Sequence, residues 1–207
     1  MKDSTYEGCT NLFPVQIHKF KLEAHLINQA LIGLEHDTHL NYDDNFVYKE
    51  VFNHPDFSDL QAEVLINVKE VCPHTTRTNE WKTVSAWLNN QPPQQSGFGF
   101  HNHADAFLSA VLYLKGSQMS LKFRDDAKEA QGTNSSEKDF DLIIRHTWNK
   151  DQKIDVAVGD LLVFPSYLLH CPNHNETNED RISIAYNLMP TRFNGPQSSP
   201  WSMDFRL

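Results

Sequence analysis

The chain has 207 residues, of which 39% are hydrophobic and 22% are charged, and its formal net charge is −9 at pH 7. This composition excludes a disordered chain and fits one compact domain better than two. The negative balance, without a dense run of Lys or Arg, argues against general binding to nucleic acid or to an anionic membrane.

Three cysteines, Cys9, Cys72 and Cys171, form neither a CxxC pair nor an even framework. This pattern argues against a disulfide-rich secreted domain and favours a reducing compartment. The first residues lack an apolar signal core, and no apolar run approaches membrane-spanning length. We therefore expect a cytoplasmic protein without a membrane partner.

Two amphipathic helices are expected in a helical part of about residues 15–75, because apolar residues recur there at helical spacing. The first covers Leu22 to Glu35, and the second starts near Pro55, with Asn53 as a possible cap, and ends before Pro73. The apolar face of the first helix consists of Leu22, Leu26, Ala30 and Leu34, and that of the second of Leu60, Val64, Val68 and Val71.

From Trp81 onward, short apolar or alternating runs between Gly, Pro and Asn turns indicate β-strands. The expected strands are 84–88, 107–114, 121–123, 143–147, 154–158, 161–164 and 181–188. The sequence thus predicts a single mainly β (α+β) domain over 1–207, with a sandwich or barrel at about 81–190, helices packed outside it, and an irregular tail from Asn194.

His101, Asn102, His103, Ala104 and Asp105 form the segment with the strongest chemical signal. In an extended chain, alternate side chains share a face, so His101, His103 and Asp105 would project together. Imidazole and carboxylate groups in this arrangement suit Fe(II) or Zn(II). The alternative is a solvated polar stretch before a strand.

A third ligand would have to come from elsewhere, and His170 is the candidate because it follows the apolar run 161–164 and Pro165. Two histidines and a carboxylate leave one face of the metal open, as in non-haem Fe(II) oxygenases. Farther on, Arg181 and Ser183 share one face of an alternating strand and could clamp a carboxylate. Surface positions for His170 and Arg181 are the alternatives.

The order of these motifs resembles the 2-oxoglutarate and Fe(II)-dependent oxygenase superfamily, and within it a group found in bacteria and phages. The segments that carry the resemblance are Leu12-Phe13-Pro14, Trp87-Leu88-Asn89, the His-x-His at 101–103, Phe164-Pro165-Ser166 before His170, and Arg181-Ile182-Ser183. The chain departs from that group at Ala104, Ala110 and Leu112, where the group has proline, glycine and tyrosine.

The resemblance implies a double-stranded β-helix (jelly-roll) barrel that binds Fe(II). Two sets of metal ligands are compatible with it. The preferred set is His103, Asp105 and His170, since an anion pairs well with a dication. In the other set, His101 and His103 take the first two positions and Asp105 lies in the turn.

The resemblance also implies a dioxygenase that uses 2-oxoglutarate and O2, releases succinate and CO2, and hydroxylates an unidentified peptide side chain or small molecule. Arg181 and Ser183 would hold the far carboxylate of 2-oxoglutarate, with Tyr113 and Asn187 as further candidates for this role. Trp87 and Asn89 are candidates for the pocket wall. Core packing or a strand-end hydrogen bond is the alternative role of these last four residues.

Two other classes of protein are compatible with parts of the pattern. His101-x-His103-x-Asp105 matches half of the metallo-β-lactamase signature of zinc hydrolases, but Ala106 stands where that signature has a histidine, and Arg181-x-Ser183 is left unexplained. A cupin-like barrel that binds without catalysis is the second alternative. A nucleic-acid demethylase of the same superfamily is disfavoured by the charge.

Overall fold

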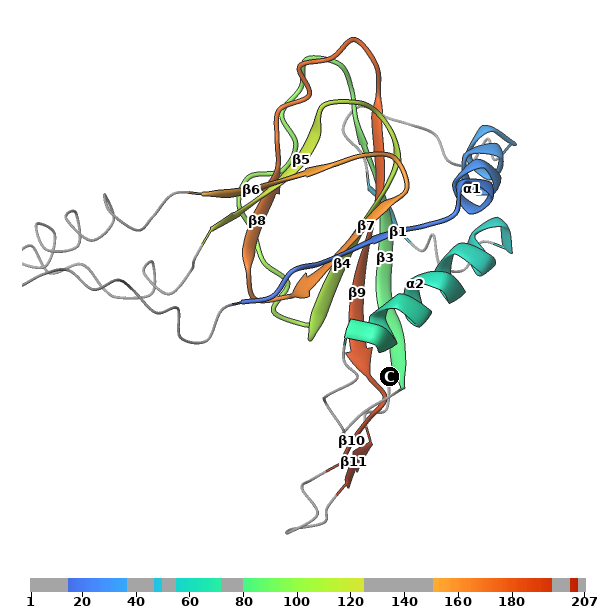
Figure 1. Cartoon of the computed structure of the whole chain (residues 1–207), viewed down its shortest axis with the longest axis vertical. Helices are drawn as coiled ribbons and strands as arrows, with labels where there is room; N and C mark the ends of the chain where they lie inside the picture. The colour runs from blue at the N-terminus through green and yellow to red at the C-terminus, as the bar shows by residue number, and fades with distance from the viewer. Residues whose placement is uncertain are drawn as a thin grey trace, which may run out of the picture.

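The computed structural model describes residues 15–36, 47–49, 55–71, 80–124, 151–194 and 202–204. Helix α1 (Ala24–His36) and helix α2 (Ser58–Val71), which follows the short 3-10 helix η2 (Pro55–Phe57), lie together on one side of the molecule (Figure 1). Both predicted helices are thereby confirmed, and their predicted apolar faces are buried except for Val71, which is partly buried. No helix in the described ranges is long and apolar enough to cross a membrane.

The larger sheet has six strands in the order β1-β7-β4-β9-β3-β2, and every neighbouring pair is antiparallel. Its strands are β1 (His18–Lys21), β7 (Asp160–Pro165), β4 (Leu108–Lys115), β9 (Arg181–Pro190), β3 (Trp81–Gln91) and β2 (Val47–Lys49). The predicted strands 84–88, 107–114, 161–164 and 181–188 are confirmed as β3, β4, β7 and β9, whereas β1 and β2 were not predicted.

A smaller antiparallel sheet faces the larger one and has the order β6-β5-β8. Its strands are β6 (Gln152–Val156), β5 (Met119–Arg124) and β8 (Leu169–Pro172). Figure 1 shows this sheet on the side of the larger sheet that is away from the helices. No strand ladder joins the two sheets in the described part of the chain, so the predicted closure into a barrel is not seen.

Strand β9 separates two hydrophobic clusters because successive side chains of a strand point to opposite faces. Its residues Ile182, Ile184, Tyr186 and Leu188 pack with α1 and α2, whereas Ala185 packs with the smaller sheet. Each fully buried Ile or Leu contributes about 1.5–3 kcal/mol through removal of apolar surface from water. The helices therefore stabilise one face of the larger sheet, and the other face is left to form the space between the sheets.

The pair Gly159–Asp160 joins β1, β4 and β7 at one corner. Gly159 has φ of 84°, its amide donates to the carbonyl of Tyr113 at 2.7 Å, and its carbonyl accepts from the amide of Leu22 at 2.8 Å. This left-handed conformation favours glycine, since other residues adopt it only with strain. The buried Asp160 carboxylate then forms ion pairs with Lys19 at 2.8 Å and Lys21 at 3.1 Å.

The predicted strand at 143–147 and the motif Leu12-Phe13-Pro14 lie outside the described residues. The tail, for which the sequence indicates no regular structure, contains β11 (Ser202–Asp204) paired with β10 (Arg192–Asn194). Each of these strands has only three residues, which is too short for an apolar or alternating pattern to reveal it in the sequence.

Candidate active site

A cavity of about 350 Å³ lies between the two sheets. The larger sheet forms the floor of this cavity. Side chains that lie opposite one another on β3, β9 and β4 form rows across that floor. One apolar row consists of Trp87, Ala185 and Val111; the next row consists of Asn89, Ser183 and Tyr113; and the last pair is Gln91 and Arg181. All eight of these side chains line the cavity. The floor therefore changes from apolar to polar along β9.

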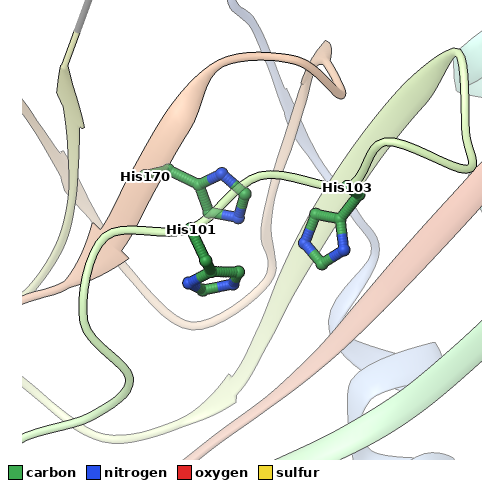
Figure 2. A group of neighbouring side chains, drawn as sticks. All are labelled: His101, His103 and His170. Atoms are coloured by element: carbon green, nitrogen blue, oxygen red, sulfur yellow. The ribbon is translucent and has the colours of Figure 1, made fainter. Parts of the chain in front are cut away.

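Three histidines converge over this floor: His101, His103 and His170. One ring nitrogen of each lies within 4.8 Å of those of the other two, and the three rings turn toward one common space (Figure 2). The ring centroids are 4.6 Å apart for His101–His170 and 5.2 Å apart for the two pairs that include His103. Such a group of imidazoles matches the ligand preference of Fe(II), Zn(II) and related cations.

Backbone carbonyls orient two of the three rings. The Nδ1 atom of His101 lies 2.8 Å from the carbonyl oxygen of Gly99, and that of His170 lies 2.9 Å from the carbonyl oxygen of Leu168. A carbonyl only accepts, so each Nδ1 must carry the proton and donate it. In a neutral ring with its proton on Nδ1, Nε2 is the unprotonated nitrogen that can bind a metal.

Burial favours the neutral form of His103 and His170. Loss of hydration lowers the pKa of His170 to about 4, and it also lowers the pKa of His103, which the nearby His101 lowers further. A histidine must be neutral to bind a metal. These two side chains would therefore bind a metal without first losing a proton at neutral pH.

Asp105 lies outside the histidine group. The chain is extended only as far as His103 and then turns at Ala104 and Asp105, and the side chain of Asp105 is exposed. The alternation that would place His101, His103 and Asp105 on one face requires an extended chain over all five residues, and the turn breaks it. The structure therefore brings together the alternative set of candidate ligands, with both early histidines, rather than the preferred set.

Arg181 is the cation of the cavity and is only 3% exposed. Its Nη1 atom donates to Gln91 and Asn173, whereas Nε and Nη2 are buried and have no hydrogen-bond partner among the described residues. Burial lowers the pKa of its guanidinium. A buried guanidinium with two free donor atoms is costly unless a ligand supplies a matching anion.

The other predicted residues of the co-substrate site divide into two groups. Ser183 and Tyr113 line the same cavity as Arg181, and the Tyr113 hydroxyl is buried without a partner in the part of the chain that the structure describes. Burial also raises the pKa of Tyr113, so its hydroxyl stays a donor. Asn187 does not line this cavity; its side-chain oxygen accepts from Ser109 at 3.4 Å. Two further residues, Gln91 and Asn173, were not predicted and contact Arg181 directly.

These residues fit a divalent metal together with a carboxylate-bearing ligand. The imidazole nitrogens supply a donor set for the metal, and the unpartnered donors of Arg181 and Tyr113 supply hydrogen bonds for an anion in the same cavity. The fold and the site together define a class of protein: a β-sandwich of two facing antiparallel sheets, with a group of histidines between them that could hold a metal ion.

Comparison with known proteins identifies the family. Residues 85–187 match the family described as "Putative 2OG-Fe(II) oxygenase". The chain belongs to the superfamily of 2-oxoglutarate and Fe(II)-dependent oxygenases, whose members are enzymes that use Fe(II) and 2-oxoglutarate. The zinc hydrolase and the non-catalytic barrel are set aside on this ground. No curated protein sequence matches the chain.

Solved structures of the same fold are oxygenases of the double-stranded β-helix type, which confirms the predicted fold. The α-ketoglutarate-dependent carbocyclase SnoK of nogalamycin biosynthesis is 12% identical, with a TM-score of 0.59 over 89% of this chain and 85% of that chain. HygX from Streptomyces hygroscopicus, with nickel and 2-oxoglutarate bound, is 13% identical, with a TM-score of 0.57 over 86% and 83%. A prolyl-4-hydroxylase of Pseudomonas putida is 13% identical, with a TM-score of 0.56 over 84% and 93%.

Proposed function

We propose that this oxygenase hydroxylates a peptide side chain or a small molecule, with conversion of 2-oxoglutarate and O2 to succinate and CO2. The observation that carries the proposal is the placement of Arg181, a buried cation with free donors, in the same cavity as three convergent histidines. The same cavity thus contains a group that could hold a metal and a group that could hold an anion.

His101, His103 and His170 would hold Fe(II), and this set is supported by the convergence of their ring nitrogens. Arg181 would bind the far carboxylate of 2-oxoglutarate, with Ser183 and Tyr113 as neighbouring hydroxyl donors. Bound Fe(II) and 2-oxoglutarate supply the redox chemistry by which one oxygen atom of O2 enters a C–H bond and the other enters succinate.

The protein's own contribution is orientation and exclusion of water. Gly99 and Leu168 fix two imidazoles through their carbonyls, so the donor atoms are aligned before the metal arrives. The floor of the cavity also has an apolar row, which would exclude water from that part of the pocket. The row consists of Trp87, Ala185 and Val111. A water-excluding wall next to the metal protects a reactive centre from side reactions.

The substrate class is proposed as a peptide side chain or a small molecule because both occur among proteins of this fold. One similar structure is a prolyl-4-hydroxylase, and another is HygX with hygromycin B bound. At the cavity of this chain, Phe98 is 52% exposed and its ring meets the edge of His101 at a centroid distance of 6.1 Å. Phe98 is therefore placed to contact an apolar part of a substrate. A cytoplasmic location remains a prediction from the sequence.

The test is aerobic incubation of Fe(II)-loaded protein with 2-oxoglutarate while succinate is measured, first alone and then with candidate peptides and small molecules. We expect slow succinate formation that a true substrate accelerates, and hydroxylated product with a mass increase of one oxygen atom. His170→Ala is the matched inactive control. Protein that binds Fe(II) and 2-oxoglutarate tightly but forms no succinate under any condition would contradict the proposal and indicate a binding protein.

A further inference from the structure

In the ranges that the structure describes, the hydrogen-bond partners of Arg181 Nη1 are all uncharged. Nη1 donates to Gln91 Oε1 at 3.0 Å, to Asn173 Oδ1 at 2.9 Å and to the Asn173 carbonyl at 2.9 Å. Side-chain carboxylates are the stronger and geometrically matched partners of arginine in protein interiors. At Arg181, the side chains in the places where carboxylates would bind most strongly are two amides, Gln91 and Asn173.

Gln91 is fixed so that its oxygen faces the guanidinium. Its Nε2 donates to the carbonyls of Gln95 at 2.8 Å and Asn173 at 3.0 Å, which leaves Oε1 as the atom turned to Arg181. The backbone carbonyl of Gln91 accepts from the fully buried Asn175 at 2.9 Å. A flipped amide would put a donor against a donor at Arg181, so the orientation of Gln91 is determined by its neighbours.

Asn173 is fixed in the same way. Its Nδ2 donates to the carbonyls of Gln118 and His174, both at 3.0 Å, and its Oδ1 also accepts from the amide of Ser120 at 2.8 Å. Asn173 thereby links β5 to the segment between β8 and β9. Hydrogen bonds to groups other than Arg181 therefore fix both side-chain amides. The two amides together determine the direction in which Nε and Nη2 of Arg181 point.

An uncharged support holds the guanidinium in place and leaves its positive charge uncompensated. Inside a protein, the attraction between a cation and a carboxylate is several times stronger than in water. If a carboxylate stood at position 91 or 173, it would compete with any anion that binds the free side of Arg181. With amides there, a ligand carboxylate supplies the missing negative charge.

We propose that Gln91 and Asn173 are positioning residues that orient Arg181 through uncharged acceptors and thereby set the affinity of the enzyme for 2-oxoglutarate. This inference rests on the proposed function, in which Arg181 binds the far carboxylate. The residues act through Arg181 and not on the reacting atoms. Their effect should accordingly appear in co-substrate binding and not in metal binding.

The test compares Gln91→Glu and Asn173→Asp with the wild type, since each adds a negative charge at almost unchanged shape. Ni(II)-loaded protein is titrated with 2-oxoglutarate, so that binding is measured without turnover, and Ni(II) binding is measured separately. We expect a dissociation constant for 2-oxoglutarate that is raised tenfold or more in both variants, with Ni(II) affinity within twofold of the wild type. Gln29→Glu, at an exposed position on α1, adds the same charge elsewhere and should change neither value.

Gln91→Leu separates charge from simple loss of a hydrogen bond, because it removes the acceptor without adding an anion. It should weaken 2-oxoglutarate binding less than Gln91→Glu does; an equal loss in the two variants would overturn the role of charge. Thermal melting of the ligand-free variants checks that they fold. If Gln91→Glu does not fold, Asn173→Asp provides an independent test. Binding within twofold of the wild type in both acidic variants would also overturn the inference.

Arg181→Ala separates this inference from the proposed function. If Arg181→Ala loses 2-oxoglutarate binding while Gln91→Glu and Asn173→Asp retain it, Arg181 still binds the co-substrate carboxylate as proposed, but the positioning role of Gln91 and Asn173 is wrong. If Arg181→Ala binds 2-oxoglutarate as the wild type does, the proposed function of Arg181 itself fails, and the positioning role fails with it.

Discussion

His101 and His170 are joined by a reciprocal pair of backbone hydrogen bonds in addition to the contact of their rings. The amide of His101 donates to the carbonyl of His170 at 3.1 Å, and the amide of His170 donates to the carbonyl of His101 at 2.9 Å. This isolated antiparallel bridge connects the segment before β4 to β8. It fixes two proposed ligands from distant parts of the chain at the level of the backbone, so the site should form without metal.

The first prediction concerns the metal ligands. We expect His101→Ala, His103→Ala and His170→Ala each to weaken Fe(II) binding by more than about 100-fold. This exceeds the roughly 10–100-fold cost of losing a residue that only hydrogen-bonds to a metal ligand. Asp105→Ala should keep metal affinity and turnover, because Asp105 is exposed and outside the histidine group. Anaerobic Fe(II) titration measures this. Inactive Asp105→Ala together with active His101→Ala would show that His103, Asp105 and His170 are the ligands instead.

The second prediction concerns stabilisation by the co-substrate. Addition of 2-oxoglutarate at 100 times its dissociation constant to Ni(II)-loaded protein should add about 2.7 kcal/mol to the free energy of unfolding, which corresponds to a rise in Tm of about 5–10 °C for a domain of this size. 2-Oxobutyrate, which lacks the far carboxylate, should stabilise much less. Thermal melting checks both ligands.

Arg181 provides the matched variant for that measurement. Arg181→Ala should weaken 2-oxoglutarate binding by about 30-fold or more, equivalent to about 2 kcal/mol, because it removes one partner of a buried charge pair. Arg181→Lys keeps the charge but loses the planar fork and should be intermediate. The difference between the two co-substrates should disappear in Arg181→Ala, and its persistence there would place the carboxylate elsewhere.

The third prediction concerns Tyr113, whose hydroxyl is buried without a partner in the described structure. Tyr113→Phe removes this hydroxyl and should leave the stability of the ligand-free protein unchanged or raise it by up to about 1 kcal/mol, since a buried unsatisfied group is unfavourable. The same change should weaken 2-oxoglutarate binding by about tenfold through loss of a hydrogen bond to a charged group. Unfolding in urea and co-substrate titration measure the two effects, and a loss of stability without a loss of binding would assign Tyr113 a structural role.

The fourth prediction concerns Asp160 at the start of β7. Burial opposes its ionised form, but hydrogen bonds from Lys19, the Ala157 amide and Lys21 outweigh this and hold its pKa below the ordinary value. The ionised form therefore stabilises the fold above the unfolded pKa near 4, and this contribution is lost as the pH falls through the folded pKa.

Asp160→Asn should consequently lower the free energy of unfolding by about 1 kcal/mol at pH 7, a modest value because both lysines are partly exposed. The difference between wild type and variant should shrink below pH 4. Urea unfolding at pH 7 and at pH 3.5 provides the comparison. A difference that stays constant across this range would mean that hydrogen-bond geometry, and not charge, stabilises this corner.

Local sequence patterns predict the central strands well. The apolar runs in β4 and β7 and the alternation in β9 identify strands because burial on one or both faces requires them. β1 and β8 escape prediction, since His18–Lys21 is short and charged and Leu169–Pro172 is only four residues long next to a turn. Their strand conformation comes from pairing with β7 and β5.

The residue types of the site can be predicted more reliably than its geometry. His103 and Arg181 lie in the cavity as the alternation in the sequence predicts, and His170 lies there as its place after the apolar run 161–164 predicts. The turn at Asp105, in contrast, depends on contacts made after folding, including the hydrogen bond from the His103 amide to the Ser166 carbonyl at 2.9 Å. Likewise, nothing near Gln91 or Asn173 in the sequence indicates that they meet at Arg181. Such contacts arise only when β3, β9 and the segment after β8 come together.

The two faces of β9 make independent engineering of the enzyme's scaffold and its pocket difficult. Ile182 and Ile184 pack toward the helices, and their neighbours Arg181, Ser183 and Ala185 line the cavity. A one-residue insertion in this strand would exchange the two sets, so that the guanidinium would face the helices and isoleucine would face the metal site. Even a conservative change of volume beneath the helices can displace the pocket wall, and variants with altered substrate choice should be sought in the loops around the opening.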